Sequence, residues 1–539
     1  MKADEAMTQV LSAMLTRRRG NSWIVLLSAA ILVMPANPGA SAQELTIGLE
    51  AYSQAKWSAS RKSFGSPVHH VPCTGDTIAF YGKGAYHLFI LKDGGWQHIR
   101  SKDLLNWEEF PMALTKGKPE DADGEYCFTG HIMEHDGTYH IFYPGVNRKH
   151  PRGSMQMMHA TSQDLINFTK HPEETWGPDG IHYKTRTQTP ERAGSVEQPT
   201  FKDQCVVWNE KEQKWWMFFS AQSVSGKFDA TPLAVSDDLI KWKQVEPIKG
   251  LPVGDCTDIF KIGEWWYRIS YDTYWRAKDL AGPWGENDSG AGYKFDTPYF
   301  FVPKRCWDGK RHVLIGGMRN YYGEVDHSNP VAPHCVAIPR EVYADAEGFL
   351  CTRPVLEVTA IYNKAILDLA KKPKPDISPL LRSWLPKGEI TPSWKYVGTE
   401  LVNADAHLNE YSHCSFDVPR DYMLKMQVHV EHKAAFTIGF REQQGDKRSG
   451  YKLVINRRTN EVEINSPSDA YPRPVNLKAD RPITVQAFMI GSILECWVND
   501  AHAFSLRDYD FPEGKLSFDV VNGRAWIQSM TVITARKKR

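Results

Sequence analysis

The sequence predicts an all-β protein, a five-bladed β-propeller followed by a C-terminal β-sandwich. Two observations lead to this prediction. A degenerate motif, S-x-D-L-x-x-aromatic, recurs at residues 101–107, 162–168 and 236–242, and a decayed copy follows at 278–284. Beyond residue 420, strand-like runs follow one another at short intervals with almost no helical pattern. Repeats of a few dozen residues that each form one sheet indicate a propeller, and the later pattern is typical of a sandwich.

The first 42 residues have the pattern of a secretory signal peptide. Three arginines at 17–19 precede an apolar run over residues 23–34, and A-S-A at 40–42 matches a cleavage site. The run is about a dozen residues long, whereas a membrane-spanning helix needs about 20, so a permanent anchor is the weaker alternative. We therefore expect cleavage after Ala42 and a mature protein that is secreted or periplasmic, with no membrane attachment.

The overall composition excludes several classes of protein. Of the 539 residues, 42% are hydrophobic and 24% are charged, and the net charge is +1. This balance fits a soluble protein of two or three domains and provides no field that would attract nucleic acid. The nine cysteines show neither C-x-x-C pairs nor histidines at zinc-site spacing, so we expect mostly buried free thiols. We also find no phosphate-binding loop and no nucleophile elbow, and we predict no metal or other cofactor.

The repeats place the propeller within residues 43–360. In each motif the serine and aspartate can satisfy backbone groups of a tight turn, while the leucine and the aromatic residue pack between neighbouring blades. The first two copies follow the strand-like runs 87–91 and 140–143, and residues 311–316 supply a strand for a fifth blade. The motif is therefore interpreted as structural, without a role in chemistry.

The pattern of the chain changes after residue 360. Residues 360–371 have helical character, and K-K-P-K-P at 371–375 is a charged, proline-broken connector, so we predict a linker over 361–390. Strand-like runs separated by turn residues then predict a β-sandwich domain over residues 391–539. The runs cover residues 423–430, 435–440, 451–455, 461–464, 483–488 and 493–498.

Three short acidic segments, each leading into an aromatic strand, are the candidate site. They contain Asp76, Asp203 and Asp255, and the strands after them include Y-H-L-F, W-W-M-F-F and W-W-Y. One carboxylate at the same point of successive blades would lie near the centre of a propeller. Two or three carboxylates in one concave site can cut a glycosidic bond, so the pattern indicates a carbohydrate-active enzyme.

Five stretches, in the right order, resemble the landmarks of glycoside hydrolase family 32, the β-fructofuranosidases. Residues 75–89 resemble the family's N-D-P-N-G segment and the strand after it. Residues 96–107 resemble its tryptophan-histidine strand, and C-F-T-G at 127–130 resembles its F-S-G segment. F-K-D-Q at 201–204 stands where the family has F-R-D-P, and D-C-T-D at 255–258 stands where it has E-C-P-D.

The resemblance extends over nearly the whole mature chain and implies a role for each aspartate. Residues 336–340 resemble the segment that closes the propeller, and residues 490–499 resemble a late sandwich strand. By this resemblance, Asp76 is the nucleophile, or the general base if the mechanism inverts. Asp203 holds ring hydroxyls in the transition state, and Asp255 donates a proton to the leaving oxygen.

Further side chains are expected around the aspartates. Glu197 is an alternative acid. Asp258 is expected to support the site, because in an extended strand it would point to the opposite face from Asp255. The resemblance implies a sugar pocket whose substrate-contacting residues are Trp96, Phe128, Thr129, Lys202 and Cys256.

Departures from the family's motifs leave the substrate open. Lys202 replaces an arginine, and an ammonium does not reproduce a planar fork of donors. Asp255 replaces a glutamate, so its separation from Asp76 would lengthen from about 5–5.5 Å, typical of retaining enzymes, towards about 6.5–9.5 Å, typical of inverting ones. We expect a secreted glycoside hydrolase that acts on oligo- or polysaccharide furanosides, fructofuranosides first. The alternatives are an inverting arabinanase or arabinofuranosidase, and a non-catalytic carbohydrate-binding protein.

Overall fold

A computed structural model describes residues 46–47, 72–73, 75–189, 200–226, 230–285, 292–319, 334–377, 394–403, 411–443, 450–467, 469–478, 481–507 and 511–535. The predicted signal peptide at 1–42 and the alternative acid Glu197 lie outside these residues. The chain divides into the units Met1–Glu44 and Leu45–Arg539, and everything below concerns the second. Within the described residues, no helix is long and apolar enough to span a membrane.

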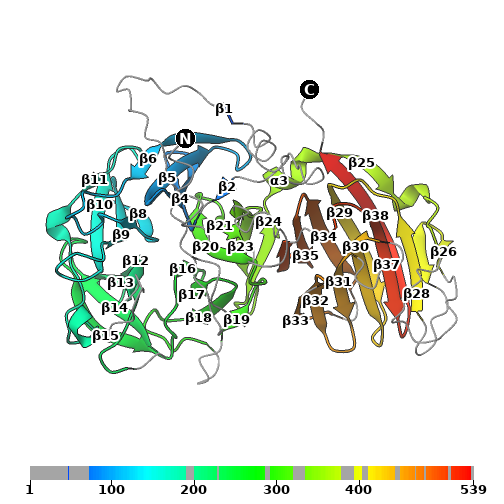
Figure 1. Cartoon of the computed structure of the whole chain (residues 1–539). Coiled ribbons are helices and arrows are strands. Elements are labelled where there is room, and N and C mark those ends of the chain that lie inside the picture. The colour runs from blue at the N-terminus through cyan, green and yellow to red at the C-terminus, as the bar shows by residue number, and fades with distance from the viewer. Residues whose placement is uncertain are drawn as a thin grey trace, which may run out of the picture. The chain divides into compact units, whose positions relative to one another are not determined.

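Five antiparallel sheets in the described part of the chain form the blades of a propeller, as the sequence predicts (Figure 1). Blade 1 contains β1 (Thr46–Ile47), β3 (Thr77–Gly82), β4 (Ala85–Lys92), β5 (Gly95–Ser101) and β6 (Trp107–Leu114). Blade 2 contains β7 (Tyr126–Cys127), β8 (His131–His135), β9 (Thr138–Val146), β10 (Met155–Ser162) and β11 (Thr169–Lys170). The short 3₁₀ turns η1 (Pro172–Glu174) and η2 (Arg186–Gln188) follow it.

The remaining blades complete the ring. Blade 3 contains β12 (Phe201–Asn209), β13 (Lys214–Ala221), β14 (Ala230–Ser236) and β15 (Lys243–Lys249). Blade 4 contains β16 (Asp258–Ile262), β17 (Trp265–Ser270), β18 (Thr273–Ala277) and β19 (Tyr293–Lys294). Blade 5 contains β20 (Phe300–Trp307), β21 (His312–Met318), β22 (His334–Val336), β23 (Arg340–Ala344), β24 (Leu350–Pro354) and β2 (Pro72–Cys73).

Hydrogen bonds between the two ends of the propeller close the ring. Strand β2 precedes blade 1 in the sequence but pairs with β22 of blade 5, with Pro72 opposite Cys335. The inner strands also contact one another in turn: β3 with β8, β8 with β12, β12 with β16, β16 with β20, and β20 with β3. The inner strands therefore surround one central axis, where residues far apart in the sequence meet.

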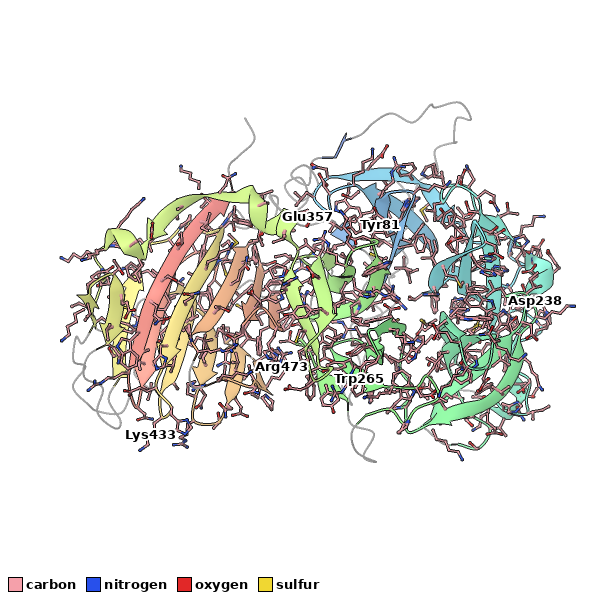
Figure 2. The ribbon with its side chains drawn as sticks, turned by 180° about the vertical axis from the view of Figure 1, so that it is seen from behind. Tyr81, Asp238, Trp265, Glu357, Lys433 and Arg473 are labelled. Atoms are coloured by element: carbon pink, nitrogen blue, oxygen red, sulfur yellow. The ribbon has the colours of Figure 1, made fainter. Side chains whose placement is uncertain are left out.

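The recurring sequence motif forms the same turn in blades 1 to 3. Its leucines, Leu104, Leu165 and Leu239, have φ angles of 61°, 67° and 65° and are buried. In blade 2, Asp164 accepts hydrogen bonds from the amides of Ile166 and Asn167, each at 2.8 Å. The corresponding Asp238 of blade 3 lies at the periphery of the propeller (Figure 2).

The aromatic residue that ends the motif packs against the preceding blade. Phe168 of blade 2 meets Phe89 of blade 1 edge to face, with ring centroids 6.1 Å apart. Trp242 of blade 3 meets Phe142 of blade 2 in the same way, at 5.7 Å. These contacts match the structural role that the sequence predicts for the motif.

Two packed sheets form the sandwich, and every strand-like run predicted beyond residue 420 is a strand (Figure 1). Residues of both sheets share one hydrophobic core. One sheet contains β25 (Tyr362–Asp368), β26 (Trp394–Val397), β27 (Glu400–Asn403), β29 (Tyr422–Val430), β34 (Ile483–Ile490), β35 (Ile493–Val498), β36 (His502–Arg507) and β38 (Ala525–Ala535). The other contains β28 (Tyr411–Phe416), β30 (Ala435–Glu442), β31 (Tyr451–Asn456), β32 (Glu461–Asn465), β33 (Ala470–Pro474) and β37 (Lys515–Val521).

The helical pattern predicted over residues 360–371 is wrong for most of its length. Helix α3 (Leu356–Ile361) ends where β25 begins, and only the 3₁₀ turn η3 (Leu369–Lys371) follows. Strand β25 pairs with β38, the last strand of the chain. A pairing partner about 170 residues away in sequence leaves no local signal, so the local helical propensity was misleading. Residues 362–368 of the predicted linker therefore form a strand of the sandwich.

A buried ion network joins blade 5 to the sandwich. Arg340 on β23 is fully buried and donates to Asp296, to Glu495 on β35 at 2.5 Å and to the hydroxyl of Ser505 at 3.1 Å. Its guanidinium also lies 3.7 Å from the centre of the Phe300 ring. Burial raises the pKa of Glu495 to about 7, and Arg340 opposes this shift. The arginine therefore provides the positive charge that two buried carboxylates need.

We expect Arg340→Met to lower the free energy of unfolding by about 3–5 kcal/mol, because it leaves buried carboxylates without a counter-charge. Urea unfolding followed by tryptophan fluorescence measures the change. Arg353→Met is the matched control, since it removes an exposed pair with Glu341 that is worth about 0–1 kcal/mol. Equal effects of the two substitutions would contradict this account of the network.

Stacked histidine pairs occupy the middle strands of blades 1 and 2. His87 and His98 are joined by a 2.8 Å hydrogen bond, and His140 and His159 by one of 2.9 Å. Burial lowers the pKa of His87, His140 and His159 to about 4 and that of His98 to about 3. The folded protein therefore holds these rings neutral.

Because each folded-state pKa is below the ordinary value of 6.5, we expect stability to fall as pH decreases from about 6.5 towards 4. In that window the unfolded chain takes up protons that the folded state excludes, at about 1.4 kcal/mol per pH unit for each proton. Urea midpoints at several pH values measure the slope. A stability that stays flat between these limits would contradict neutral, buried pairs.

Candidate active site

One residue from each blade lies at the same level of the central axis. Asp76 lies directly before β3. Thr129 and Cys256 each lie two residues before the first residue of β8 and of β16. Asp203 and Val302 are the third residues of β12 and β20. We call these five residues the upper ring. Asp255, the predicted proton donor, stands one residue before the ring position of blade 4.

Hydrogen bonds join four members of the upper ring. Asp76 accepts from the Thr129 hydroxyl, and its Oδ2 lies 3.2 Å from the sulfur of Cys256. The backbone N–H of Cys256 donates to Oδ2 of Asp203 at 3.0 Å. Burial raises the pKa of the Cys256 thiol well above its usual value, so the sulfur keeps its proton and donates a hydrogen bond to Asp76. Two of the predicted catalytic aspartates are thus brought together through one cysteine.

Left-handed backbone conformations create this arrangement. Asp203, Cys256 and Val302 have φ angles of 63°, 51° and 46°, which are uncommon for residues other than glycine. The pairing register shifts between Lys202 and Cys205 and again between Phe301 and Lys304, so β12 and β20 each carry a bulge. A bulge re-aims the side chain at its extra residue, and here it directs the ring residue to the axis.

Asp203 is the most deeply buried of the three predicted catalytic aspartates. It is 2% exposed, and burial raises its pKa to about 7. The charges of Asp255 and Asp76 raise the pKa further, whereas Lys202 and the Cys256 amide lower it. Asp203 is therefore poised to change its protonation state near neutral pH.

Lys202 lies between two carboxylates. Its Nζ is 3.6 Å from Oδ2 of Asp255 and 3.9 Å from Oδ2 of Asp203. Ser220 donates to Oδ1 of Asp255 at 3.0 Å, and Ser270 donates to the Asp255 carbonyl at 3.0 Å. The Asp255 side chain is 41% exposed, whereas that of Asp203 is only 3% exposed. The predicted residues Lys202 and Asp255 thus stand beside the ring.

A buried arginine supports the third acidic segment from behind. Arg268 on β17 is fully buried, and its three guanidinium nitrogens have no hydrogen-bond partner among the described residues. It stacks on Trp275 at 4.6 Å. A Cβ on Gly254 would lie 1.8 Å from its Nη2, so only glycine allows this approach. Sequence reasoning missed Arg268, because an arginine in an aromatic strand carries no signal of burial.

Of the two aromatic residues predicted to line the pocket, Trp96 is fully buried and Phe128 is partly exposed. Trp96 is fully buried and donates from Nε1 to the Phe128 carbonyl at 3.1 Å, which places it behind the segment that carries Thr129. Phe128 is partly buried and stacks near the exposed Tyr126, with centroids 5.8 Å apart. Tyr271, which the sequence analysis did not single out, packs with Cys256, Phe301 and Val302.

A second layer of polar side chains lies two residues farther along the inner strands. His131, Cys205 and Asp258 bring three possible metal-ligand atoms within 4.8 Å of one another. Lys304 completes the layer and donates to the Thr257 carbonyl, and its charge, after burial, helps to lower the pKa of His131 to about 3. Asp258 accepts from the Arg305 amide at 2.6 Å, in keeping with a supporting position.

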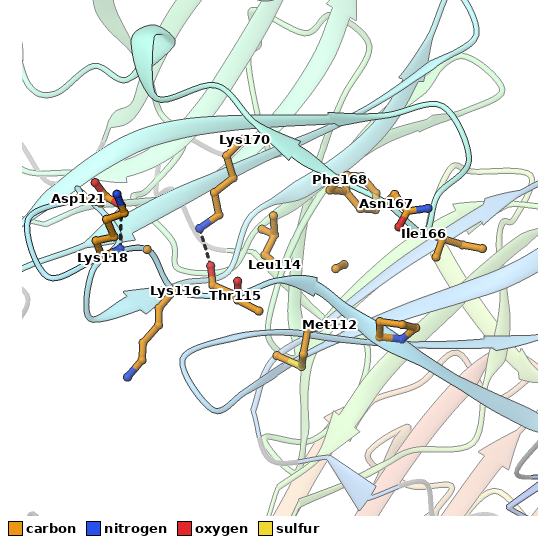
Figure 3. A pocket seen from close by; sticks show the side chains of 13 residues that line it. Met112, Leu114, Thr115, Lys116, Lys118, Asp121, Ile166, Asn167, Phe168 and Lys170 are labelled. Carbon is orange, nitrogen blue, oxygen red and sulfur yellow. Dashed lines mark hydrogen bonds between the residues drawn. The ribbon is translucent and has the colours of Figure 1, made fainter. Parts of the chain in front are cut away.

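A separate crevice of about 580 Å³ lies between blades 1 and 2 (Figure 3). Residues 111–118, Asp121, residues 166–168 and Lys170 line it, and none of the three predicted aspartates does. The Lys170 ammonium at its floor donates to the Thr115 carbonyl and to the buried Asp123. Because none of the three predicted aspartates lines this crevice, we do not assign the chemistry to it.

The eight cysteines whose side chains the structure describes are buried and form no disulfide, as predicted for most of them. Their thiols behave as small apolar groups in the interiors of the blades and the sandwich. Cys256 differs from the others because it contacts a predicted catalytic carboxylate.

Comparison with known proteins agrees with this fold. A model of the glycosyl hydrolases family 32 N-terminal domain matches residues 78–354. The raffinose invertase of Escherichia coli is 24% identical over 527 residues, which cover 88% of this chain and 96% of that protein. The structure of sucrose-6-phosphate hydrolase from Lactobacillus gasseri matches with a TM-score of 0.62 and 15% identity, over 92% of this chain and 98% of that chain. The structure of the exo-inulinase from Aspergillus awamori also matches with a TM-score of 0.62 and 15% identity, over 88% of this chain and 99% of that chain.

A propeller with carboxylates at its centre, followed by a sandwich, defines a class of carbohydrate-active hydrolase. The family match covers more than half of the chain. The chain belongs to glycosyl hydrolases family 32, and the protein is a glycoside hydrolase.

We expect Asp203→Asn to stabilise the protein at about pH 8. The folded-state pKa of Asp203, about 7, is above its ordinary value of 3.8, so protonated Asp203 favours folding at low pH and this contribution is lost as pH rises through 7. The amide removes the cost of a buried carboxylate, and the gain should reach roughly 2–4 kcal/mol at about pH 8 and vanish near pH 4. Urea unfolding at both pH values measures it, with the exposed Asp237→Asn as control. A loss of stability at high pH would refute the burial argument.

Proposed function

We propose that the protein is a secreted fructofuranosidase that hydrolyses β-fructofuranosyl bonds in sucrose or in fructan oligosaccharides. The observation that carries this proposal is the joining of Asp76 and Asp203 by Cys256, with Asp255 as the next residue along the chain. Three carboxylates are thereby gathered at one end of the propeller axis. The similarity to an invertase over almost the full length of both chains supports the substrate class.

Asp76 is proposed to act on the anomeric carbon. The two hydrogen bonds to its carboxylate, from Thr129 and Cys256, are both donated to Oδ2. Oδ1 has no hydrogen-bond partner among the described residues and can face the sugar. Donors on one oxygen hold the group as an oriented carboxylate, as a nucleophile or general base requires.

Asp255 is proposed to donate the proton that the leaving oxygen needs. The glycosidic C–O bond breaks, the leaving oxygen takes the proton of Asp255, and water supplies the hydroxyl of the released fructose. In a retaining mechanism Asp76 first forms a bond to the anomeric carbon, and water then displaces it while giving a proton back to Asp255. In an inverting mechanism Asp76 takes a proton from the attacking water. Asp203 binds ring hydroxyls beside these groups.

Secretion is proposed from the composition of residues 1–42. Mass spectrometry of the protein recovered from the native host's envelope or medium tests it. A mature N-terminus at Gln43 is expected, and full-length protein confined to the cytoplasm would contradict secretion.

We expect the purified protein to release fructose from sucrose, inulin or levan and no arabinose from arabinan. Asp76→Asn and Asp255→Asn should each lower kcat by at least about 10³-fold, because each removes a group that takes part in bond breaking. Asp237→Asn is the matched control, since that side chain is 77% exposed. Reducing-sugar assays give the rates, and NMR of the first anomer released distinguishes retention from inversion.

Each outcome bears on a different part of the proposal. Saccharide binding without turnover by the native protein would make it a binding protein. Release of arabinose alone would replace the substrate class. Full activity in both variants would show that the catalytic groups are other residues.

A further inference from the structure

A strained tyrosine forms the tip of a hairpin in blade 4. The strands β17 and β18 pair up to Ser270 and Thr273, so Tyr271 and Asp272 make a two-residue turn. Tyr271 has φ 52°. It is the only aromatic residue with a left-handed backbone in the described part of the chain. Glycine, asparagine and aspartate adopt this conformation readily, whereas a bulky side chain there costs about 1–3 kcal/mol.

The hairpin tip lies at the edge of the blade that carries the acidic segment. Ser270, the residue before Tyr271, donates to the Asp255 carbonyl at 3.0 Å. The Tyr271 ring packs against Cys256, whose sulfur lies 3.2 Å from Oδ2 of Asp76. Phe301 and Val302 of blade 5 complete this cluster. Tyr271 therefore stands on the blade-4 and blade-5 side of the carboxylates.

The turn itself does not require a tyrosine. Its partner residue provides the anchors: Asp272 accepts from Lys294 at 2.8 Å through both carboxylate oxygens, and its carbonyl accepts from the Phe295 amide at 3.0 Å. The Tyr271 hydroxyl makes no hydrogen bond to any described residue, and the residue is only partly buried. A costly conformation in a turn that Asp272 already anchors, with the hydroxyl unused by any described residue, points to a role in binding or catalysis.

The surroundings keep this hydroxyl in its donor form. Burial, the largest cause, and the nearby carboxylates of Asp255, Asp76 and Asp203 raise the pKa of Tyr271 far above its usual value. All three predicted catalytic aspartates thus act on the phenol. Arg319 lies over the Tyr271 ring, 5.9 Å from its centroid.

We propose that Tyr271 contacts the substrate: its ring forms a wall of the saccharide site with Phe301, and its O–H donates a hydrogen bond to the leaving-group oxygen beside Asp255. This inference rests on the proposed glycosidase function. Tyr271 gives no proton away. Asp255 transfers the proton, and the phenol stabilises the charge that builds on the oxygen as the C–O bond breaks. The Tyr271 O–H would be a second hydrogen-bond donor to the leaving oxygen, which compensates for the short side chain of the acid Asp255.

Two substitutions separate a role in binding from a role in the fold. Tyr271→Phe keeps the ring and the strained backbone and removes only the hydroxyl. It should lower kcat/KM for sucrose about 10- to 100-fold, the value of one hydrogen bond to a charged group, without changing Tm. Tyr271→Gly should lower kcat/KM at least as much while leaving Tm unchanged or higher, because glycine relieves the strain. A purely structural tyrosine would give the reverse pattern.

Leaving groups of different acidity provide an independent measurement. The loss in Tyr271→Phe should be smaller for p-nitrophenyl β-fructofuranoside than for sucrose, because the nitrophenolate oxygen needs less stabilisation. The matched control is Tyr81→Phe, since Tyr81 lies at the other end of β3 from Asp76 and is also partly exposed (Figure 2). Its kcat/KM should equal that of the native enzyme for both substrates.

The outcomes distinguish this inference from the proposed function. If the native enzyme cleaves sucrose and Tyr271→Phe retains its kcat/KM, the contact is refuted while the glycosidase function stands. If the native protein binds sucrose without cleaving it, calorimetry decides: binding about tenfold weaker in Tyr271→Phe supports the contact, and equal binding refutes it. A native protein that neither cleaves nor binds fructosides overturns both.

Discussion

The two hydrogen bonds of Cys256 are the contacts on which the site depends. Its thiol donates to Asp76 of blade 1, and its amide donates to Asp203 of blade 3. Two like-charged groups held this close in a partly buried site repel each other and lose hydration, so each needs a donor on its oxygens. One residue of blade 4 supplies both donors, and its left-handed backbone allows the sulfur and the amide to face different blades.

The scaffold makes such a strained centre possible. Blades 1 to 3 carry the same aspartate-stabilised turn, and the inner strands contact one another around the axis. Strand β2 closes the ring, and the Arg340 network joins blade 5 to the sandwich. With its surroundings fixed in this way, the propeller can hold Asp203 buried beside other carboxylates. This arrangement lowers the stability of the fold and raises the pKa of the Asp203 carboxyl towards neutral pH, as functional sites commonly do.

Much of this architecture was predictable because it is local. The motif turns, the strands beyond residue 420 and the Y-H-L-F and W-W-Y strands all follow from turn chemistry and β-propensity. The three aspartates were found from their place before those strands. Strand β25 was missed because its pairing with β38 leaves no trace in residues 362–368. Arg268 and Tyr271 were missed because neither burial nor a left-handed backbone at these residues has a sequence signature.

By itself, the sequence determined that this is an all-β chain of repeated sheets with three candidate carboxylates and the landmarks of a glycosidase family. Only the tertiary structure decided how these carboxylates are held. It placed Cys256, and not Asp255, at the ring position of blade 4, and it set Lys202 between Asp203 and Asp255. The physical reason is distance along the chain. Cys256 and Asp76 are 180 residues apart, and only closure of the ring brings a thiol and a carboxylate so remote in sequence into contact.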